Sequence, residues 1–306
     1  MDGEPARQPS DLRVAVLGPG GVGGLLAALL AQAGASVTCL AGAGTVEVLR
    51  TSGLRVESRL LGVVTPHVDA AERLTAPVDV CLVCVKATHL DAALERVPAD
   101  VLGNALLVPL LNGVEHVAAL RQRYPDASVV PAAIRVESTR TEPGVVHHDS
   151  PFVTVDLVAP EGAAERVDRL AGVLERAGVT VRTLDDEAAV LWGKLTFLAP
   201  FALLTTSARA TAGEVRESRR DDLLALVREV AAVARAEGAP GDADLVVGFF
   251  DGVPAGMRSS MQRDAAAGRS TELDAIGGAV VRAAERHGID VPVTARYVAE
   301  LRAATD

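Results

Sequence analysis

Two lysines stand out among the residues that could do chemistry, because arginine carries almost all the other positive charge of the chain. Of 30 Lys plus Arg residues, only Lys86 and Lys194 are lysine, and both lie in apolar runs, VCLVCVK and VLWGKLTFL. Arginine keeps its proton near neutral pH, whereas a lysine withdrawn from water can release it. Lys194 is therefore a candidate acid or base and Lys86 a candidate ligand anchor. The alternative is that both are accidents of an Ala- and Arg-rich composition.

A glycine-rich loop near the start of the chain has the pattern of a dinucleotide site. Gly18, Gly20 and Gly23 follow the apolar run RVAVLG and open the helix-forming run at 25–34. In such a strand–turn–helix unit the first glycine permits a tight turn and the second lets backbone N–H groups approach a pyrophosphate. The third lets the helix pack on the strand. The predicted cofactor loop comprises Gly18, Pro19, Gly20, Gly21, Val22 and Gly23.

The turn after the second predicted strand, at 36–41, does not distinguish NAD from NADP. A carboxylate there would bind the ribose hydroxyls of NAD, but the turn begins at Gly42 and continues with Ala43 and Gly44. Arg50 is the nearest cation, and it could either reach a 2′-phosphate or be an ordinary residue of the helix surface.

Composition narrows the class of protein. A chain of 306 residues predicts two domains, and a net charge of −10 argues against nucleic acid or an anionic membrane as a partner. Three cysteines and the lack of a signal peptide favour a reduced cytoplasm. The apolar run at 188–208 has the length of a membrane span, but Lys194 and Pro200 interrupt it, so we expect a buried core helix.

The hydrophobic pattern changes along the chain. Near-continuous apolar runs at 78–86, 105–113 and 128–136 predict a parallel sheet covered on both faces. A hairpin with a Pro-Gly turn is expected over 141–158. Beyond it the pattern predicts a helix at 161–177, a strand at 179–184, and then helices only, including 215–238 and 270–288.

We therefore predict an α/β protein. A flexible extension spans residues 1–11. An N-terminal Rossmann-type parallel-sheet domain, which binds a dinucleotide, spans 12–185. An all-helical substrate and catalytic domain spans 186–306.

Over nearly its whole length the chain resembles the ketopantoate reductase family (2-dehydropantoate 2-reductase, NADPH-dependent). Six marks in the right order carry the resemblance: GPGGVG at 18–23, VKATHL at 85–90, NGVE at 112–115, WGKL at 192–195, SSMQRDAAAGRSTELDAIGG at 259–278, and HGIDVP at 287–292.

The resemblance implies roles for particular residues. Lys194 falls on the catalytic acid of the family, and Glu272 on a glutamate that helps bind the cofactor and order the site. Ser260 falls on a serine that contacts substrate, and Lys86 and Asn112 fall on residues that contact the cofactor. Without the resemblance, Glu272 would be a first-turn acid that complements a helix dipole, and Ser260 a helix cap.

The chain departs from the family pattern around the substrate and the 2′-phosphate. Gly42 replaces a frequent arginine, while Leu198, Ala202 and Met257 replace asparagines of the usual substrate pocket. Leu198 and Ala202 follow Lys194 by four and eight residues, so an apolar wall beside the lysine is expected. A polar diol-type substrate would lose hydrogen bonds worth about 0.5–1.5 kcal/mol each. Either the substrate has changed, or the genome disfavours asparagine and other groups replace it.

The expected activity is the NADPH-dependent reduction of a 2-keto acid to a 2-hydroxy acid, as in pantothenate biosynthesis, with NAD not excluded and no metal. One alternative is a related dehydrogenase for a more apolar keto acid or an imine. Another is a non-catalytic NADP(H) sensor, which would have no need of the proton donor Lys194. The oligomeric state is left open, with a homodimer as one expectation.

Overall fold

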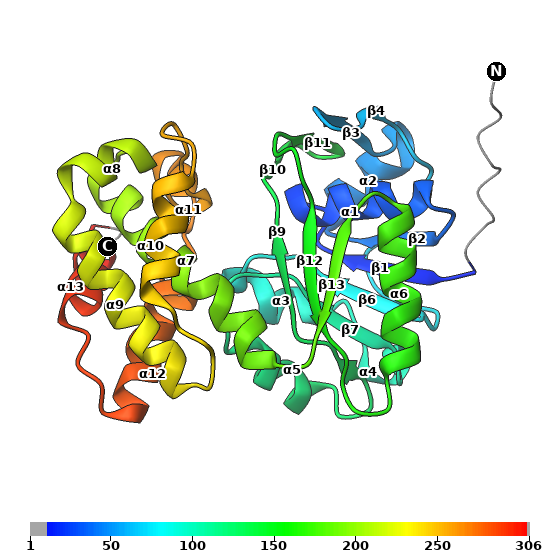
Figure 1. Ribbon diagram of the computed structural model, residues 1–306. Coiled ribbons are helices and arrows are strands. Elements are labelled where there is room, and N and C mark those ends of the chain that lie inside the picture. Colours follow the sequence, from blue (N-terminus) through cyan, green and yellow to red (C-terminus); the bar gives the residue numbers. More distant parts are fainter. Residues whose placement is uncertain (1–10, 305–306) are drawn as a thin grey trace, which may run out of the picture. The chain divides into compact units, whose positions relative to one another are not determined.

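The computed structural model describes residues 11–304, which divide into two compact units (Figure 1). The first unit comprises the chain up to Leu111 together with His116–Asp185. The second comprises Asn112–Glu115 and the chain from Asp186 onward. Apart from Asp11, the extension expected over residues 1–11 lies outside the described residues.

A six-stranded parallel sheet organises the first unit, which confirms the predicted fold class. Its strand order is β5-β2-β1-β6-β7-β8. The central strands are almost entirely buried because both faces of the sheet are covered. The strands are β1 (Arg13–Leu17), β2 (Ser36–Leu40), β5 (Asp69–Ala71), β6 (Val80–Val83), β7 (Leu106–Pro109) and β8 (Ser128–Val129).

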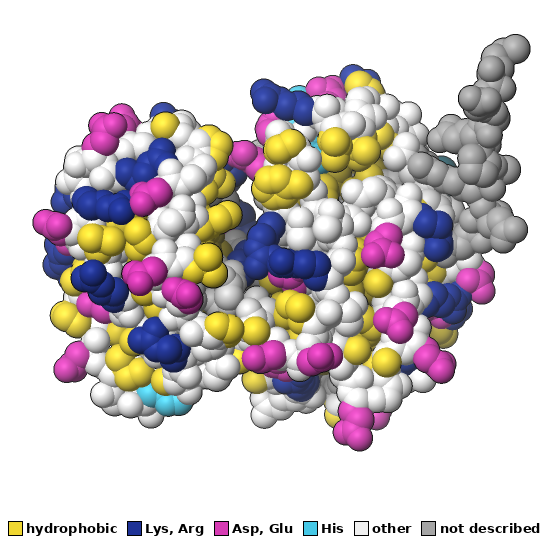
Figure 2. Space-filling view, viewed as in Figure 1, with side chains coloured by type: hydrophobic (Ala, Val, Ile, Leu, Met, Phe, Trp, Pro, Cys, Tyr) yellow, Lys and Arg dark blue, Asp and Glu magenta, His cyan; other side chains and the backbone are white. Residues whose placement is uncertain are grey.

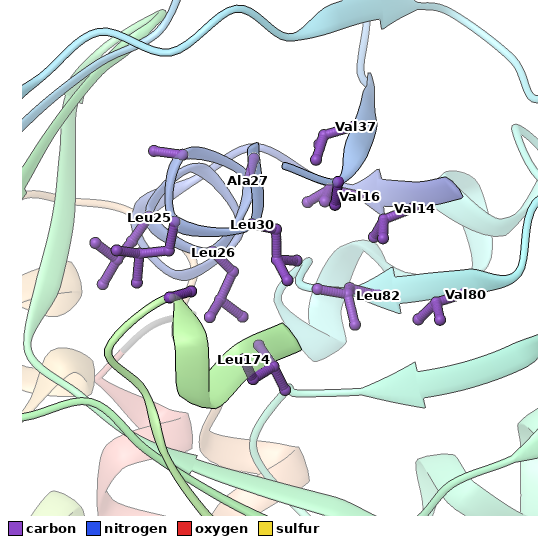
Figure 3. Close-up of a cluster of buried hydrophobic side chains, with 14 of the residues drawn as sticks. Val14, Val16, Leu25, Leu26, Ala27, Leu30, Val37, Val80, Leu82 and Leu174 are labelled. Carbon is purple, nitrogen blue, oxygen red and sulfur yellow. The ribbon is translucent and has the colours of Figure 1, made fainter. Parts of the chain in front are cut away.

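The helices and short helical turns of the first unit are α1 (Gly21–Gln32), α2 (Ala43–Ser52), η1 (Ala87–His89), α3 (Leu90–Leu94), α4 (Ala99–Leu102), α5 (His116–Arg123) and α6 (Ala164–Arg176). Leu26 and Leu30 of α1 lie in one cluster with Val16 of β1, Leu82 of β6 and Leu174 of α6 (Figure 3). The Leu30 side chain is fully buried, so truncating it to alanine should cost about 2–5 kcal/mol. This packing holds α1 against the sheet.

Two smaller sheets complete the first unit. The Pro143-Gly144 turn joins β10 (Ser138–Glu142) to β11 (Val145–His148) in the predicted antiparallel hairpin, and β3 (Arg55–Ser58) and β4 (Gly62–Val64) extend that sheet. The sequence suggested that the strand β12 (Thr154–Val158) belongs to this hairpin, but it does not. It pairs instead with β13 (Thr180–Leu184) and with β9 (Ala132–Arg135).

The predicted strand at 128–136 is two strands. Pro131 separates β8 from β9, and these two strands belong to different sheets. A proline has no N–H to donate to a ladder, so it favours such a break.

The second unit consists of helices: α7 (Glu187–Ala208), α8 (Ala212–Ser218), α9 (Arg220–Ala236), α10 (Ala243–Gly252), α11 (Ser260–Ala266), the π-helical turn η2 (Asp274–Gly278), α12 (Ala279–His287) and α13 (Pro292–Ala303). The predicted helix at 215–238 is interrupted at Arg219, between α8 and α9. By length and composition alone α7 could cross a membrane, but 67% of its most apolar window is buried inside the structure. A core helix of a soluble protein passes the same test.

Charged side chains of both signs are interspersed over the visible face of each unit (Figure 2). In this view neither unit carries the continuous basic surface that a nucleic-acid partner would require.

Candidate active site

The glycine loop connects β1 to α1, and neighbouring protein atoms require glycine at Gly18, Gly21 and Gly23. Gly18 has φ +87°, and a Cβ there would lie 2.5 Å from Cγ1 of Val85. A Cβ at Gly23 would overlap the carbonyl oxygen of Gly18 and lie 2.9 Å from Cβ of Cys84. Only glycine therefore allows the tight turn and the close contact between helix and strand.

Gly20 differs, because no protein atom requires it to be glycine. It has an ordinary φ of −84°, and a Cβ built on it meets no heavy atom within 4 Å. Gly20 is the N-cap of α1 without a side-chain cap, so the N–H groups of the first turn have no intrahelical acceptors. Gly20 thus leaves open space at the start of α1. The loop therefore fits a pyrophosphate, with the helix dipole favouring its charge.

The other loop residues support this arrangement. Pro19 is buried, and Val22 is half-buried and packs on the core. A Cβ on Gly21 would overlap the carbonyl oxygen of Ser138, and the Ser138 hydroxyl donates to the Gly21 carbonyl at 2.8 Å. The hairpin strand β10 therefore holds the start of α1.

Lys86 lies beside the glycine loop. It follows β6, whose neighbour in the sheet is β1, and the Val85 residue before it is the one that Gly18 contacts. Lys86 is half-buried and is the residue that precedes η1. The structure therefore brings the predicted ligand anchor to the carboxyl edge of the sheet, where dinucleotides bind in folds of this type.

The hydrogen bonds of Arg50 bear on its two alternatives. Its Nε and Nη2 atoms donate to the carbonyl oxygen of Ala70, at 3.1 and 2.9 Å. The exposed Arg50 therefore bonds the main chain of β5, which fits an ordinary residue of the helix surface. Gly42 is the N-cap of α2.

In the second unit, Asn112 and Glu272 are directly paired. The amide of Asn112 donates to Oε2 of Glu272 at 2.8 Å, across 160 residues of chain. Glu272 is only 6% exposed. A first-turn acid that merely complements the helix dipole would lie in solvent, so the burial and the distant partner favour the site role over that alternative.

The whole segment Asn112–Glu115 is fastened to the helices after Glu272. Gly113 has φ +98°, and a Cβ there would lie 2.6 Å from the carbonyl oxygen of Ala275 in η2. Arg282 of α12 donates to Glu115 at 2.7 and 3.0 Å. These contacts explain why four residues that follow β7 belong to the helical unit, and why Asn112 must be followed by glycine.

Lys194 lies in the first half of α7 on its least buried stripe. Lys194, Phe197 and Leu198 are each half-buried, whereas Leu195 and Ala199 belong to the core. Residues three and four apart share a helix face, so the two apolar side chains flank the lysine. Lys194, which the sequence suggested is buried, is thus only partly buried.

The prediction that Ala202 forms part of an apolar wall beside Lys194 is wrong. Ala202 is 0% exposed and packs within the core of the helical unit, so it lines no open surface. Leu198 is partly exposed, and Met257 is partly buried against the same core.

An aromatic cluster, which the sequence analysis missed, adjoins this stripe. Phe197 contacts Phe201, Phe249 and Phe250, with ring centroids 5.3, 4.9 and 5.8 Å away. The chain has five phenylalanines, so all but Phe152 gather here. Phe249 of α10 remains 58% exposed. The pairs Phe249–Phe250 and Phe197–Phe201 lie on separate helices, and nothing in their spacing indicates that they meet.

The serine pair that begins α11 divides its tasks. Ser259 is buried and caps the helix by accepting from the Gln262 amide at 3.1 Å, and its hydroxyl also bonds Thr205 of α7 at 2.8 Å. Ser260 is exposed and is the first residue of the helix. The cap is therefore Ser259, and the Ser260 hydroxyl is available to a substrate.

The cysteines are not placed for metal or thiolate chemistry. Burial raises the pKa of Cys39 and of Cys81 to about 12, and burial also raises the pKa of Cys84. Within residues 11–304 no group of three or more His, Cys, Asp or Glu residues could hold a metal ion.

Comparisons with known proteins match both units of the chain to one family. The family description "Ketopantoate reductase PanE/ApbA" matches residues 14–156, and its C-terminal counterpart matches residues 187–305. A 2-dehydropantoate 2-reductase of Mycobacterium tuberculosis is 36% identical over 96% of this chain and 98% of the relative.

Solved structures share the fold. A PanE/ApbA family ketopantoate reductase from Ralstonia eutropha has a TM-score of 0.86 at 29% identity, covering 96% of this chain and 99% of that one. D-mandelate dehydrogenase with NADH and anilino(oxo)acetate has a TM-score of 0.87 at 21% identity, with the same coverage. The paired family matches and the near-complete coverage establish that the chain belongs to the ketopantoate reductase family of oxidoreductases.

Proposed function

We propose that this protein reduces a 2-keto acid to a 2-hydroxy acid with NADPH, and that Lys194 is the general acid. The observation that carries the proposal is the placement of Lys194. It is one of two lysines in the chain, and it lies half-buried on the open stripe of α7 between apolar neighbours. An ammonium group in such a place is an effective proton donor and a counter-charge for a carboxylate.

The chain's own residues would divide the work as follows. Gly18, Gly20 and Gly23 with the start of α1 hold the pyrophosphate, and Lys86 contributes a cation beside them. A reduced nicotinamide bound there supplies the hydride. Residues 12–185, apart from Asn112–Glu115 of the helical unit, would thus be the dinucleotide-binding domain, and residues 186–306 the substrate and catalytic domain.

In the helical domain, Lys194 would hydrogen-bond the keto oxygen and transfer a proton to it as negative charge develops. Ser260, exposed at the start of α11, would contact the substrate. Glu272, held by Asn112 at 2.8 Å, would orient the cofactor and the lysine. A ketopantoate substrate would place the reaction in pantothenate biosynthesis, in the cytoplasm.

A second candidate substrate, a bulkier apolar or aryl 2-keto acid, is favoured by the aromatic cluster. Phe249 is 58% exposed next to Phe197, which follows Lys194 by three residues. A solved protein of the same fold is a D-mandelate dehydrogenase with NADH and anilino(oxo)acetate, a compound that carries a phenyl ring. Leu198 in place of a polar residue further favours an apolar substituent.

The decisive test is oxidation of NADPH and NADH, followed by nicotinamide absorbance, with ketopantoate beside phenylglyoxylate and branched-chain 2-keto acids. The proposal expects turnover with at least one 2-keto acid and a preference for NADPH. Tight NADPH binding without turnover on any of them would favour the sensor alternative. Light scattering of the same preparation tests the expected homodimer.

A further inference from the structure

We propose that Arg96 recognises the 2′-phosphate of NADPH, taking the place of a side chain at position 42. The inference rests on the proposed use of NADPH, and it names the residue that would make the protein bind NADPH more tightly than NADH. It is based on the Arg96 guanidinium that lies next to Gly42, and not on the sequence of the turn itself.

Gly42 lies at the edge of the sheet where the glycine loop lies. Strands β1 and β2 are parallel, with Leu17 opposite Leu40, and the Gly18 amide donates to the Leu40 carbonyl at 3.0 Å. Gly42 follows Leu40 by two residues. When a pyrophosphate lies on the loop, the adenosine ribose lies at the end of the second strand, where NAD-dependent proteins carry an acid. Here no side chain is present to contact it.

The guanidinium of Arg96 lies beside this position. A Cβ built on Gly42 would lie 3.7 Å from Nη2 of Arg96, and it meets no other heavy atom within 4 Å. Arg96 comes from the chain after α3, more than fifty residues away in sequence, so its proximity cannot be read from the β2–α2 turn. A glycine at position 42 leaves the approach to this guanidinium open.

Arg96 is also held in place. Its Nη1 donates to the Glu72 carbonyl at 2.9 Å, and its own carbonyl accepts from the Leu74 amide at 2.8 Å. In the part of the chain that the structure describes, no carboxylate forms an ion pair with Arg96. The guanidinium is therefore anchored by a neutral acceptor and keeps its full charge for an anion.

The chemistry selects a phosphate over a hydroxyl. A guanidinium offers several N–H donors and a permanent positive charge to a phosphate dianion, whereas the 2′-hydroxyl of NADH gains only a neutral hydrogen bond. Hydrogen bonds to charged groups are worth about 10- to 100-fold in affinity. The same guanidinium does not weaken the binding of NADH. Its loss should therefore lower the affinity for NADPH and leave the affinity for NADH nearly unchanged.

The test is calorimetric binding of NADP⁺ and NAD⁺, together with adenosine 2′,5′-bisphosphate and adenosine 5′-monophosphate, to the full-length protein. Arg96→Leu should weaken NADP⁺ and the bisphosphate by about 10- to 100-fold and change NAD⁺ and the monophosphate by less than about 2-fold. Arg96→Lys should retain part of the affinity. Arg50→Leu is the matched control, because Arg50 also donates to a main-chain carbonyl of the neighbouring segment, and it should leave the discrimination intact.

Each contrary outcome has a distinct meaning. If the wild type prefers NADP⁺ and Arg96→Leu keeps that preference, another group holds the phosphate and the inference is wrong while the proposed function stands. Equal loss of NADP⁺ and NAD⁺ in Arg96→Leu would make Arg96 a structural residue and also overturn it. A wild type without preference for NADP⁺ removes both the proposed cofactor preference and the role of Arg96.

Discussion

At the scale of single residues, the pairing of Asn112 with Glu272 joins two parts of the sequence that are 160 residues apart. The sequence contains only two asparagines, and the resemblance pointed to the one that precedes Gly113. The buried carboxylate of Glu272 and the donor 2.8 Å away give that assignment a physical basis. A buried charge that loses one of its hydrogen-bond donors offsets less of its desolvation cost.

Replacing Asn112 by alanine should therefore lower the free energy of unfolding of the helical unit by about 1–3 kcal/mol. Denaturation followed by the fluorescence of Trp192, the only tryptophan, reports on that unit. Asn104→Ala, at an exposed position, is the control and should change little. In a Glu272→Gln background the cost of Asn112→Ala should shrink; equal costs in both backgrounds would show that the pair is not coupled.

At the scale of elements, substitutions at two glycines of the loop should have different effects, one on dinucleotide binding and the other on stability. Gly20→Ala places a methyl group where no protein atom lies within 4 Å, whereas a Cβ at Gly23 overlaps the Gly18 carbonyl. Gly20→Ala should leave the free energy of unfolding within about 1 kcal/mol of the wild type and weaken dinucleotide binding at least about 10-fold. Gly23→Ala should cost about 1–3 kcal/mol of stability. Thermal melts and calorimetry on both variants measure the contrast, and a Gly20→Ala protein that binds NADPH normally would refute the assigned phosphate position.

The three-stranded sheet of β9, β12 and β13 depends on one buried carboxylate. Asp156 is 1% exposed; burial raises its pKa, but hydrogen bonds from Arg182 and Arg135 outweigh burial and hold the pKa below its ordinary value. Because the pKa is lower in the folded state than in the unfolded state, the carboxylate contributes stability at neutral pH. That contribution is lost as pH falls through the folded-state pKa.

Asp156→Asn should therefore lower the unfolding temperature at neutral pH and reduce the further loss on acidification. Melting curves of both proteins between neutral and acidic pH test this. Parallel pH profiles would mean that Asp156 does not govern the acid sensitivity of this sheet.

The aromatic cluster of α7 and α10 should select apolar substrates. Phe249→Ala removes an aromatic ring that is 58% exposed, so it should hardly affect folding but should lower kcat/KM for phenylglyoxylate by about 10-fold and for ketopantoate far less. Phe152, the phenylalanine outside the cluster, is 49% exposed and gives the matched control Phe152→Ala. Steady-state kinetics with both substrates suffice, and equal losses on the two would remove Phe249 from substrate selection.

The sequence predicted the positions of the helices and strands better than it predicted which strands pair with one another. The alternation of strand and helix, the apolar strands and the glycine pattern are local signals, and β1, α1 and β2 lie where those signals placed them. Sheet partnership is not local: Pro131 sends β9 into a different sheet from β8, and β12 pairs away from the hairpin before it. For the same reason Ala202 proved buried, and Arg96 and Phe249 were missed, since each depends on a neighbour that is distant in the chain.

At the scale of the whole molecule, the candidate site residues are divided between two compact units. The glycine loop and Lys86 belong to the first unit, and Asn112, Lys194 and Glu272 belong to the second. The composition marks the same division, because each unit contains one of the chain's two lysines. The two lysines should therefore perform separable tasks: Lys86 should bind the cofactor and Lys194 should transfer a proton.

The most direct measurement is therefore the kinetic comparison of Lys194→Ala with Lys86→Ala, using NADPH and the best 2-keto acid together with calorimetric NADPH affinity. Lys194→Ala should lower kcat by about 10²- to 10⁴-fold and leave NADPH affinity within about 2-fold, whereas Lys86→Ala should weaken NADPH binding and spare most of kcat. Undiminished turnover in Lys194→Ala, with a folded protein that binds NADPH, would contradict the assignment of the acid.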